Sequence, residues 1–430
     1  MCRLEGGDAG GIASGGEASL DLIPRSRRNQ TLKGSDLRGW AMAMVGEYRF
    51  IAQDRVIFGR PAAEAVLAEA ERREAERVFI VASKTLSQTT DAVDRIREAL
   101  GRRAVGLFDE TVAHVPRESV LRLAEDVRAA SPDLIVTIGG GTPIDTVKVM
   151  LVALAENIHS VDAFNDFHIR VGEGGRVIAP RIAAPPMRQI IVPTTLSGAE
   201  FSNLGAAIDQ ASRVKHLYTG RDVGGDSVIL DPTMTMHTPE WLWLSTGMRS
   251  VDHAIESLCS TAPQPFTDAT CARGLAMLAA SLRSSREAPD DLEARLECQM
   301  GVWLSTTGLG RIPWGASHGI GHQLGAVAGV PHGHCSCVML PSVLRYNFEV
   351  NAAQQRTVSA AMDRRDLEAG DAVAELVDDL GQPAKLRDVG VTRDHFQAII
   401  EGSLTNLFVS QNPRKLTEPE QIRDILDMAW

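Results

Sequence analysis

The chain has 430 residues, of which 44% are hydrophobic and 23% charged, the balance of a globular protein long enough for two or three domains. Its formal net charge of −11 argues against nucleic acid or an anionic membrane as the main partner. No apolar run reaches the roughly 20 residues that span a bilayer, so no membrane segment is expected. The six cysteines form no C-x-x-C pair, so reduced thiols in a cytoplasmic protein fit better than disulfides.

Residues 1–45 differ in composition from the rest of the chain. Glycines are frequent in the first 16 residues, and a basic patch follows at Arg25, Arg27 and Arg28. The segment lacks the apolar centre of a secretory signal, and its acidic residues disfavour a transit peptide. We therefore expect a disordered extension, with the folded chain beginning near Met44.

The segment from residue 46 to 235 alternates between strand-like and helix-like patterns. Short apolar runs predict strands, and apolar residues spaced three and four apart predict helices. Strands that alternate with helices imply a parallel sheet with helices on both faces. The strands are predicted at residues 78–83, 134–138 and 189–192, and the helices at residues 91–100 and 119–129.

Helical patterns dominate from residue 236 to 430, where strand-like runs are few. The expected fold is therefore an N-terminal α/β domain with a parallel sheet, followed by an all-helical C-terminal domain. The cleft between two such domains is where a ligand site is expected by default. Helices of the second domain are predicted at residues 240–259, 268–282, 292–307 and 371–380.

A glycine-rich turn follows the strand predicted at residues 134–138. Residues 139–141 are all glycine, Thr142 is a candidate N-cap, and Pro143 suits the first turn of a helix. Such a helix N-terminus offers unpaired N–H groups to a pyrophosphate, and glycines let the phosphates come close. The same turn also occurs for packing alone, Asp145 could serve only in a capping box, and the common G-x-G-x-x-G pattern is missing.

A loop rich in hydroxyl groups follows the strand predicted at residues 189–192. Pro193 ends that strand, and Thr194, Thr195 and Ser197 come next. These hydroxyls could hydrogen-bond the amide or ribose of a nicotinamide nucleotide. Serine and threonine are also common in ordinary turns, so the loop alone is weak evidence.

Histidines are concentrated in a glycine-rich stretch near residue 320. His318 and His322 are four residues apart, so on a helix they share one face, and His332 follows ten residues later. A single core histidine is usually a satisfied polar group, but this density favours a catalytic or metal site. Cys335 and Cys337, beside the cluster, are either further ligands or small packed residues. Upstream, one predicted helix carries His253 together with Arg249, Asp252 and Glu256.

At these residues the sequence resembles the iron-containing, or group III, alcohol dehydrogenase family. The motifs that carry the resemblance are spread over most of the chain, and their common order makes it specific. They are Val56-Ile57-Phe58-Gly59, the glycine turn with Asp145, the Pro-Thr-Thr loop, Leu230-Asp231-Pro232, Thr246-Gly247-Met248, His253-Ala254-Ile255-Glu256, the block from residue 318 to 347, and Asn412-Pro413-Arg414.

The resemblance implies the architecture shared by dehydroquinate synthase and the group III alcohol dehydrogenases, and with it an NAD or NADP site. Pyrophosphate contacts would come from Gly139, Gly140, Gly141 and Thr142, and the rest of the cofactor site would be lined by Asp145, Thr194, Thr195 and Lys215. A divalent metal, iron or zinc, is held in this family by one Asp and three His. The three histidines match His253, His318 and His332, and His322 matches a histidine thought to relay a proton beside the nicotinamide.

The chain departs from the family at the fourth metal ligand, where Arg249 stands in place of the Asp. A guanidinium cannot ligate a cation, and Asp252 projects about 60° away around the helix. Three histidines could still hold zinc. Alternatively Arg249 supplies the positive charge itself, as in a metal-independent branch, the maleylacetate reductases, or it only forms a salt bridge with Asp252 or Glu256.

Residues after the second strand bear on the choice of cofactor. NAD-preferring relatives carry an acid there that binds the ribose hydroxyls, whereas this chain has Ser83 and then Lys84. A serine would not repel a 2′-phosphate and a lysine would attract it. NADP is therefore expected to be tolerated.

The predicted activity is reversible hydride transfer between NAD(P) and a small alcohol or carbonyl compound. His253, Arg249 and His322 would act at the substrate, with His322 delivering the proton because histidine titrates near neutrality. Three alternatives stay open: reduction of an unsaturated oxo-acid, a non-redox lyase on the same fold, and a non-catalytic binding protein. A homo-oligomer, often a dimer in this family, is expected.

Overall fold

The computed structural model describes residues 47–172 and 177–430, and within it residues 48–430 form one compact unit. The predicted extension at residues 1–45 therefore lies outside the described residues, as does Cys2. None of the helices in the described ranges combines the length and apolarity that a membrane crossing needs.

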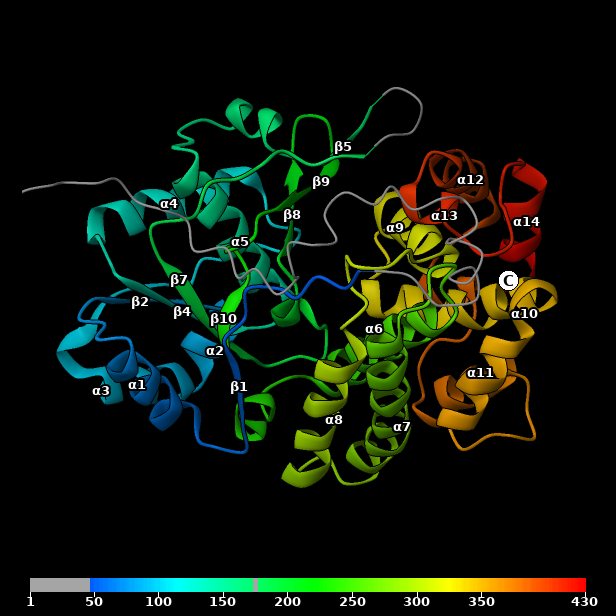
Figure 1. Ribbon diagram of the computed structural model, residues 1–430, viewed down its shortest axis with the longest axis horizontal. Coiled ribbons are helices and arrows are strands. Elements are labelled where there is room, and N and C mark those ends of the chain that lie inside the picture. The colour runs from blue at the N-terminus through cyan, green and yellow to red at the C-terminus, as the bar shows by residue number, and fades with distance from the viewer. Residues whose placement is uncertain (1–46, 173–176) are drawn as a thin grey trace, which may run out of the picture. The chain divides into compact units, whose positions relative to one another are not determined.

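A six-stranded parallel sheet forms the centre of the N-terminal half, in the order β1-β10-β7-β4-β2-β3 (Figure 1). The central strands are buried along their whole length, as expected of a parallel sheet covered on both faces. The strands are β1 (Arg55–Phe58), β2 (Val78–Ala82), β3 (Ala104–Phe108), β4 (Leu134–Gly139), β7 (Arg188–Pro193) and β10 (Gly225–Leu230).

Helices cover both faces of this sheet. One hydrophobic cluster joins α1 and α3 to the sheet, and a second joins α4 and α5 to its other face. The three strands and two helices predicted here are confirmed, with ends that differ by one or two residues. The helices are α1 (Ala62–Arg72), α2 (Lys84–Thr89), α3 (Ala92–Leu100), α4 (Arg117–Ala130) and α5 (Gly141–Ala155).

Two antiparallel hairpins interrupt the expected alternation of strand and helix. One pairs β8 (Leu204–Asp209) with β9 (Val214–Thr219), and the other pairs β5 (Arg170–Val171) with β6 (Val177–Ile178). Neither was predicted, because β8 is rich in alanine and the strands of the second hairpin have two residues each. The first hairpin matters for the site, because β9 carries Lys215.

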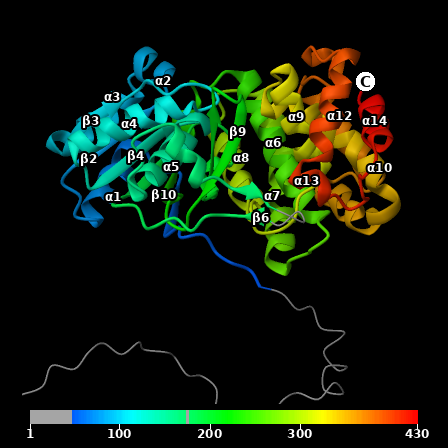
Figure 2. The ribbon, with the colours of Figure 1, turned by 90° about the horizontal axis from the view of Figure 1, so that it is seen from above.

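Helices make up the C-terminal half, as predicted, and they continue to the end of the chain (Figure 2). Among them α9 and α10 carry the histidine-rich stretch and are separated by a three-residue turn. The helices are α6 (Glu240–Leu258), α7 (Pro265–Glu287), α8 (Leu292–Ser305), α9 (Ala316–Ala328), α10 (His332–Ala361), α11 (Ala369–Asp379), α12 (Phe396–Leu404), α13 (Leu407–Ser410) and α14 (Pro419–Met428).

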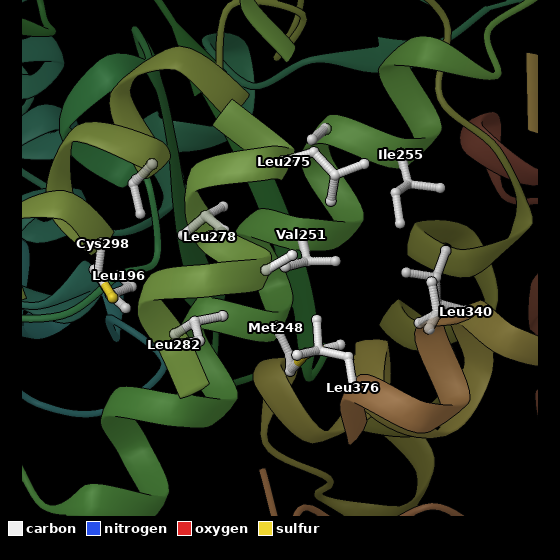
Figure 3. Packing of buried hydrophobic residues seen from close by; sticks show 14 of the residues in the cluster. Leu196, Met248, Val251, Ile255, Leu275, Leu278, Leu282, Cys298, Leu340 and Leu376 are labelled. Carbon is white, nitrogen blue, oxygen red and sulfur yellow. The ribbon is translucent and has the colours of Figure 1, made fainter. Parts of the chain in front are cut away.

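One hydrophobic cluster spans both halves of the chain. It combines residues of the sheet and of α5 with the inner faces of α6, α7 and α8 and with α10 and α11. Figure 3 shows part of it, with Leu196 from the first half among residues of α6, α7 and α8. This shared core holds α6, which carries Arg249 and His253, against the loop that follows β7. The expected boundary near residue 235 stays a prediction.

Candidate active site

The glycine turn is a sharp corner between β4 and α5. β4 ends at Gly139, whose φ of 143° is a conformation that other residues rarely adopt, and α5 begins at Gly141 after the N-cap Gly140. The expected N-cap Thr142 is therefore wrong: Thr142 is the second residue of the helix, because glycine at the corner lets α5 begin earlier. No side chain caps α5, so its first N–H groups remain available to a ligand.

Three loops meet at this corner. A Cβ atom on Gly140 would lie 2.8 Å from Cγ2 of Thr195, and one on Gly139 would lie 3.4 Å from Cβ of Ser83. The N–H of Thr194 donates to the carbonyl of Gly139 at 3.1 Å. The structure thus brings Ser83 and both threonines to the turn, and the close packing of Thr195 on Gly140 leaves no room for a larger side chain there.

A buried lysine lies beneath the corner. Lys148 of α5 is 1% exposed, and its Nζ donates to the carbonyl oxygens of Ala199 at 2.6 Å and Leu204 at 2.9 Å. It also lies 3.6 Å from the carboxylate of Asp145. Lys148 therefore ties Asp145 to the loop after the Pro-Thr-Thr motif. The capping-box role considered for Asp145 is not observed.

The hydroxyl-rich loop leads from the corner to α6. The N–H of Leu196 donates to Thr246 Oγ1 at 3.1 Å, and Ser250 Oγ donates to the carbonyl of Leu196 at 2.6 Å. A Cβ atom on Gly198 would lie 3.4 Å from Nδ1 of His253. The same loop thus touches the glycine corner at one end and the histidine cluster at the other.

The histidines come from three helices and form two contacting pairs. His253 of α6 stacks on His318 of α9, with ring centroids 5.2 Å apart. His322 of α9 faces His332, the first residue of α10, at 6.1 Å. His332 also contacts Lys215 of β9, whose Nζ lies 3.4 Å from its Nε2. The contact between Lys215 and His332, like that of the Gly198 loop with His253, joins the N-terminal half to the cluster.

Two acidic side chains hold the buried end of the cluster. Glu256 accepts hydrogen bonds from the backbone N–H groups of Gly315 and Ser317, and its Oε2 lies 2.8 Å from Nδ1 of His318. This contact directs Nε2 of His318 away from the carboxylate, and that buried atom has no partner in the described part of the chain. Asp252 accepts hydrogen bonds from Ser317 at 2.8 Å and from Ser336 at 2.7 Å.

Arg249 lies among these groups with 12% of its side chain exposed. Its Nη1 donates to Ser336 Oγ at 3.2 Å and lies 3.8 Å from Asp252 Oδ2. The salt bridge with Asp252 that the sequence left open is therefore formed. No nitrogen of Arg249 is both buried and unpartnered, so its remaining donors are not fully enclosed by the protein.

Comparison with known proteins now decides the family. The sequence pattern of the iron-containing alcohol dehydrogenases matches residues 53–232, and that of the family's C-terminal domain matches residues 243–430. The chain belongs to the iron-containing alcohol dehydrogenase family. This family comprises NAD-dependent oxidoreductases of alcohols and aldehydes, so the predicted resemblance and architecture are confirmed.

Similar proteins cover nearly all of the folded chain. The dehydrogenase ALT3 of Alternaria alternata is 32% identical over 82% of this chain and 98% of its own. Lactaldehyde reductase of Escherichia coli K12 is 29% identical over 89% of this chain and 99% of its own. The crystal structure of maleylacetate reductase from Agrobacterium tumefaciens is 26% identical, with a TM-score of 0.75 over 90% of this chain and 99% of that one.

Burial and the charge of Arg249 disfavour protonated imidazoles in the histidine cluster of this member of the alcohol dehydrogenase family. Burial, and then the charge of Arg249, lower the pKa of His253 and His318 well below the usual value, and lower that of His322 to about 3. The expectation that His322 titrates near neutrality is therefore wrong, because it included neither the burial of His322 nor the neighbouring guanidinium. Burial and the nearby Asp252 raise the pKa of Glu256 to about 8.

The metal site implied by the family does not fit these residues. Among residues 47–172 and 177–430, one group of possible ligand atoms converges closely enough for an ion, and it consists of Asp252, Glu256 and His318. Those carboxylates are already occupied by N–H and O–H donors, and Arg249 lies beside them. His253, His318 and His332 do not converge in this way, so their role as metal ligands stays a prediction. Fe²⁺ or Zn²⁺ bound by that group would lie near the guanidinium, whose Nη1 is 3.8 Å from Oδ2 of Asp252.

Several residues of the site escaped the sequence reasoning. Trp314 stacks on His253 at 4.9 Å and contacts His318 at 4.2 Å, and Phe408 lies 5.3 Å from His322. Ser336 and Lys148 were also missed, although Lys148 had a signal: a lysine in an otherwise apolar helix. Cys335 and Cys337 are fully buried, and burial raises their pKa, as expected of packed thiols.

Proposed function

We propose that this protein catalyses reversible hydride transfer between NAD(P) and a small alcohol or its aldehyde or ketone. The observation that carries the proposal is the double connection between the glycine corner and the histidine cluster. The Gly198 loop reaches His253, and Lys215 reaches His332. A dinucleotide bound with its pyrophosphate at the corner would therefore have a path to the cluster.

The cofactor would be held mainly by backbone. Gly140, Gly141 and Thr142 offer the N-terminus of α5 to the pyrophosphate, and the loop with Thr194 and Thr195 offers hydroxyl and carbonyl groups. Asp145 and Lys215 would line the remainder. Because Ser83 borders the corner where NAD-selective relatives have an acid, NADP should be accepted as well as NAD.

Bound NAD(P)H supplies the hydride, and the chain's own residues would handle the oxygen and the proton. Arg249 can donate to a carbonyl oxygen and stabilise the negative charge that develops there. His253 and His318 would border that oxygen with neutral imidazoles. His322 is half-buried and its lowered pKa favours the neutral form, so it would donate its N–H proton to the oxygen while its other ring nitrogen accepts a proton from water.

Steady-state kinetics with the purified protein test this proposal. Wild-type protein should oxidise NADH or NADPH when a small aldehyde or ketone is added. The His322→Ala variant should lose about 100-fold or more in kcat with little change in NADPH affinity, because proton transfer typically contributes that much. His159→Ala, at an exposed loop histidine, is the control and should behave as wild type. Full activity of His322→Ala would remove His322 from the mechanism.

Arg249 favours a second candidate, the metal-independent reduction of an unsaturated oxo-acid. A guanidinium with spare donors can clamp a carboxylate in two hydrogen bonds. Turnover of dicarboxylic oxo-acids at a rate that chelators leave unchanged would support it. NAD(P)H consumption with any carbonyl substrate would count against a lyase or a non-catalytic protein. Assembly into a homo-oligomer also remains a proposal, testable by light scattering.

A further inference from the structure

The histidine cluster already contains a cation that belongs to the chain. Arg249 lies on α6 one turn before His253, and its guanidinium contacts Ser336 at 3.2 Å and Asp252 at 3.8 Å. Oδ2 of Asp252 also lies 3.5 Å from Nδ1 of His318. The guanidinium therefore borders the acidic end of the cluster.

The surroundings of Arg249 are built to keep it there. Ser336 accepts a hydrogen bond from the guanidinium and donates one to Asp252, so the three groups form a chain. Asp252 is fully buried and takes a further hydrogen bond from Ser317, which fixes its carboxylate as the counter-charge. A buried carboxylate with such partners compensates the charge of a guanidinium in place.

The position of Arg249 also disfavours a divalent ion at the cluster. Among the described residues the converging group of possible ligand atoms consists of Asp252, Glu256 and His318, and Asp252 is the partner of the guanidinium. An arginine keeps its charge at any physiological pH, so a divalent ion brought among these atoms would be repelled by a charge that cannot be titrated away.

We propose that the charge of Arg249 keeps divalent metals out of the histidine cluster. The chain would then need no metal to fold. This inference concerns metal binding alone, so it can fail or hold independently of the proposed reaction.

Metal binding by the full chain tests the inference directly. Wild-type protein dialysed after exposure to Fe²⁺, Zn²⁺ or Co²⁺ should retain less than roughly a tenth of an equivalent per chain by elemental analysis. Arg249→Asp supplies a carboxylate at the same position and should bind about one equivalent of Co²⁺, with the visible absorption bands of a protein-bound ion. A second change, His318→Ala, should abolish that gain.

Arg249→Gln separates loss of charge from gain of a ligand. It should bind Co²⁺ more weakly than Arg249→Asp but more strongly than wild type. One equivalent of metal in wild-type protein that is lost in His318→Ala would overturn the inference, and so would a folded Arg249→Asp that takes up no Co²⁺. If Arg249→Asp does not fold, the wild-type and Arg249→Gln measurements still decide.

Discussion

Two cations with little exposure, Lys148 beneath the glycine corner and Arg249 beside the histidine cluster, are held in different ways. The ammonium of Lys148 contacts two backbone carbonyls and the carboxylate of Asp145, all within 3.6 Å. The guanidinium of Arg249 makes one hydrogen bond and one ion pair on the same side. An ammonium has three donors and a guanidinium five, so the first is satisfied and the second is not.

This difference separates a positioning residue from one that can act on a ligand. Lys148 holds two loops at fixed distances and has no donor left for a substrate. Arg249 is anchored through Nη1 and keeps donors that are not fully enclosed by the protein. Buried charge alone therefore does not identify a catalytic group, and the number of unused donors is the more useful observation.

Replacing Lys148 should have the largest effect on stability. Lys148→Met keeps the length of the side chain but leaves the carbonyls of Ala199 and Leu204 and the carboxylate of Asp145 without their cation. Breaking a buried charge arrangement by removing one partner typically costs about 3–5 kcal/mol. We expect that loss in urea unfolding, together with a raised KM for NAD(P)H and a smaller change in kcat, because the corner is displaced while the cluster is not.

A surface lysine provides the matched control for this comparison. Lys415 is exposed and donates to a single backbone carbonyl, that of Ser410 at 3.2 Å. Lys415→Met should change the free energy of unfolding little, since water replaces the lost partner. Equal effects of the two substitutions would show that Lys148 is not a positioning residue.

The glycine corner could be predicted from sequence because consecutive residues build it. A strand, three glycines and a helix are local features, and only the exact N-cap was wrong, since Gly140 rather than Thr142 precedes the helix. The loop containing Thr195 was also recognised. Its close approach to Gly140, where an added Cβ would lie 2.8 Å from Cγ2 of Thr195, depends on the register of β4 and β7. Such register is not visible in a single sequence.

The histidine cluster was predicted only in part, because its chemistry depends on distant partners. The spacing of His318 and His322 indicated a common helix, and both do lie on α9. It did not indicate that His318 would bind Glu256 while His322 would face Phe408, or that Ser336 would link Arg249 to Asp252. Burial, and then the charges of Arg249 and Lys215, lower the pKa of His322, and none of these is visible in the spacing of the histidines.

Glu200 beside the glycine corner should make stability depend on pH. Burial raises the pKa of Glu200 to about 7, against the opposing charge of Lys148. A carboxyl whose pKa is raised on folding favours the folded state when protonated. Its contribution is therefore fully present below about pH 4.5 and is lost as pH rises through 7, to the extent of at most about 3 kcal/mol.

Comparing Glu200→Gln with wild type isolates this contribution. Glutamine cannot ionise, so the variant should gain stability relative to wild type between pH 5 and pH 8, as thermal unfolding would show. The exposed Glu110 is a control, and Glu110→Gln should follow the wild-type profile. If the stability of Glu200→Gln changed with pH in the same way as that of wild type, Lys148 would already compensate an ionised Glu200. Lys148 and Arg249 would then differ less than proposed.

The smallest expected effect on stability comes from Ser336, the residue that anchors Arg249. Ser336→Ala removes the hydrogen bond from the guanidinium and the one to Asp252, and hydrogen bonds to charged groups contribute about 1.5–3 kcal/mol each before relaxation. Because Arg249 can move toward Asp252, we expect a net loss of only about 1–2 kcal/mol in unfolding experiments. The kcat should also fall, because a guanidinium that is free to move stabilises a developing charge less well. Ser342→Ala, at a buried position on the same helix that contacts neither group, should leave kcat unchanged, and a similar kcat for both variants would place Arg249 outside the reaction.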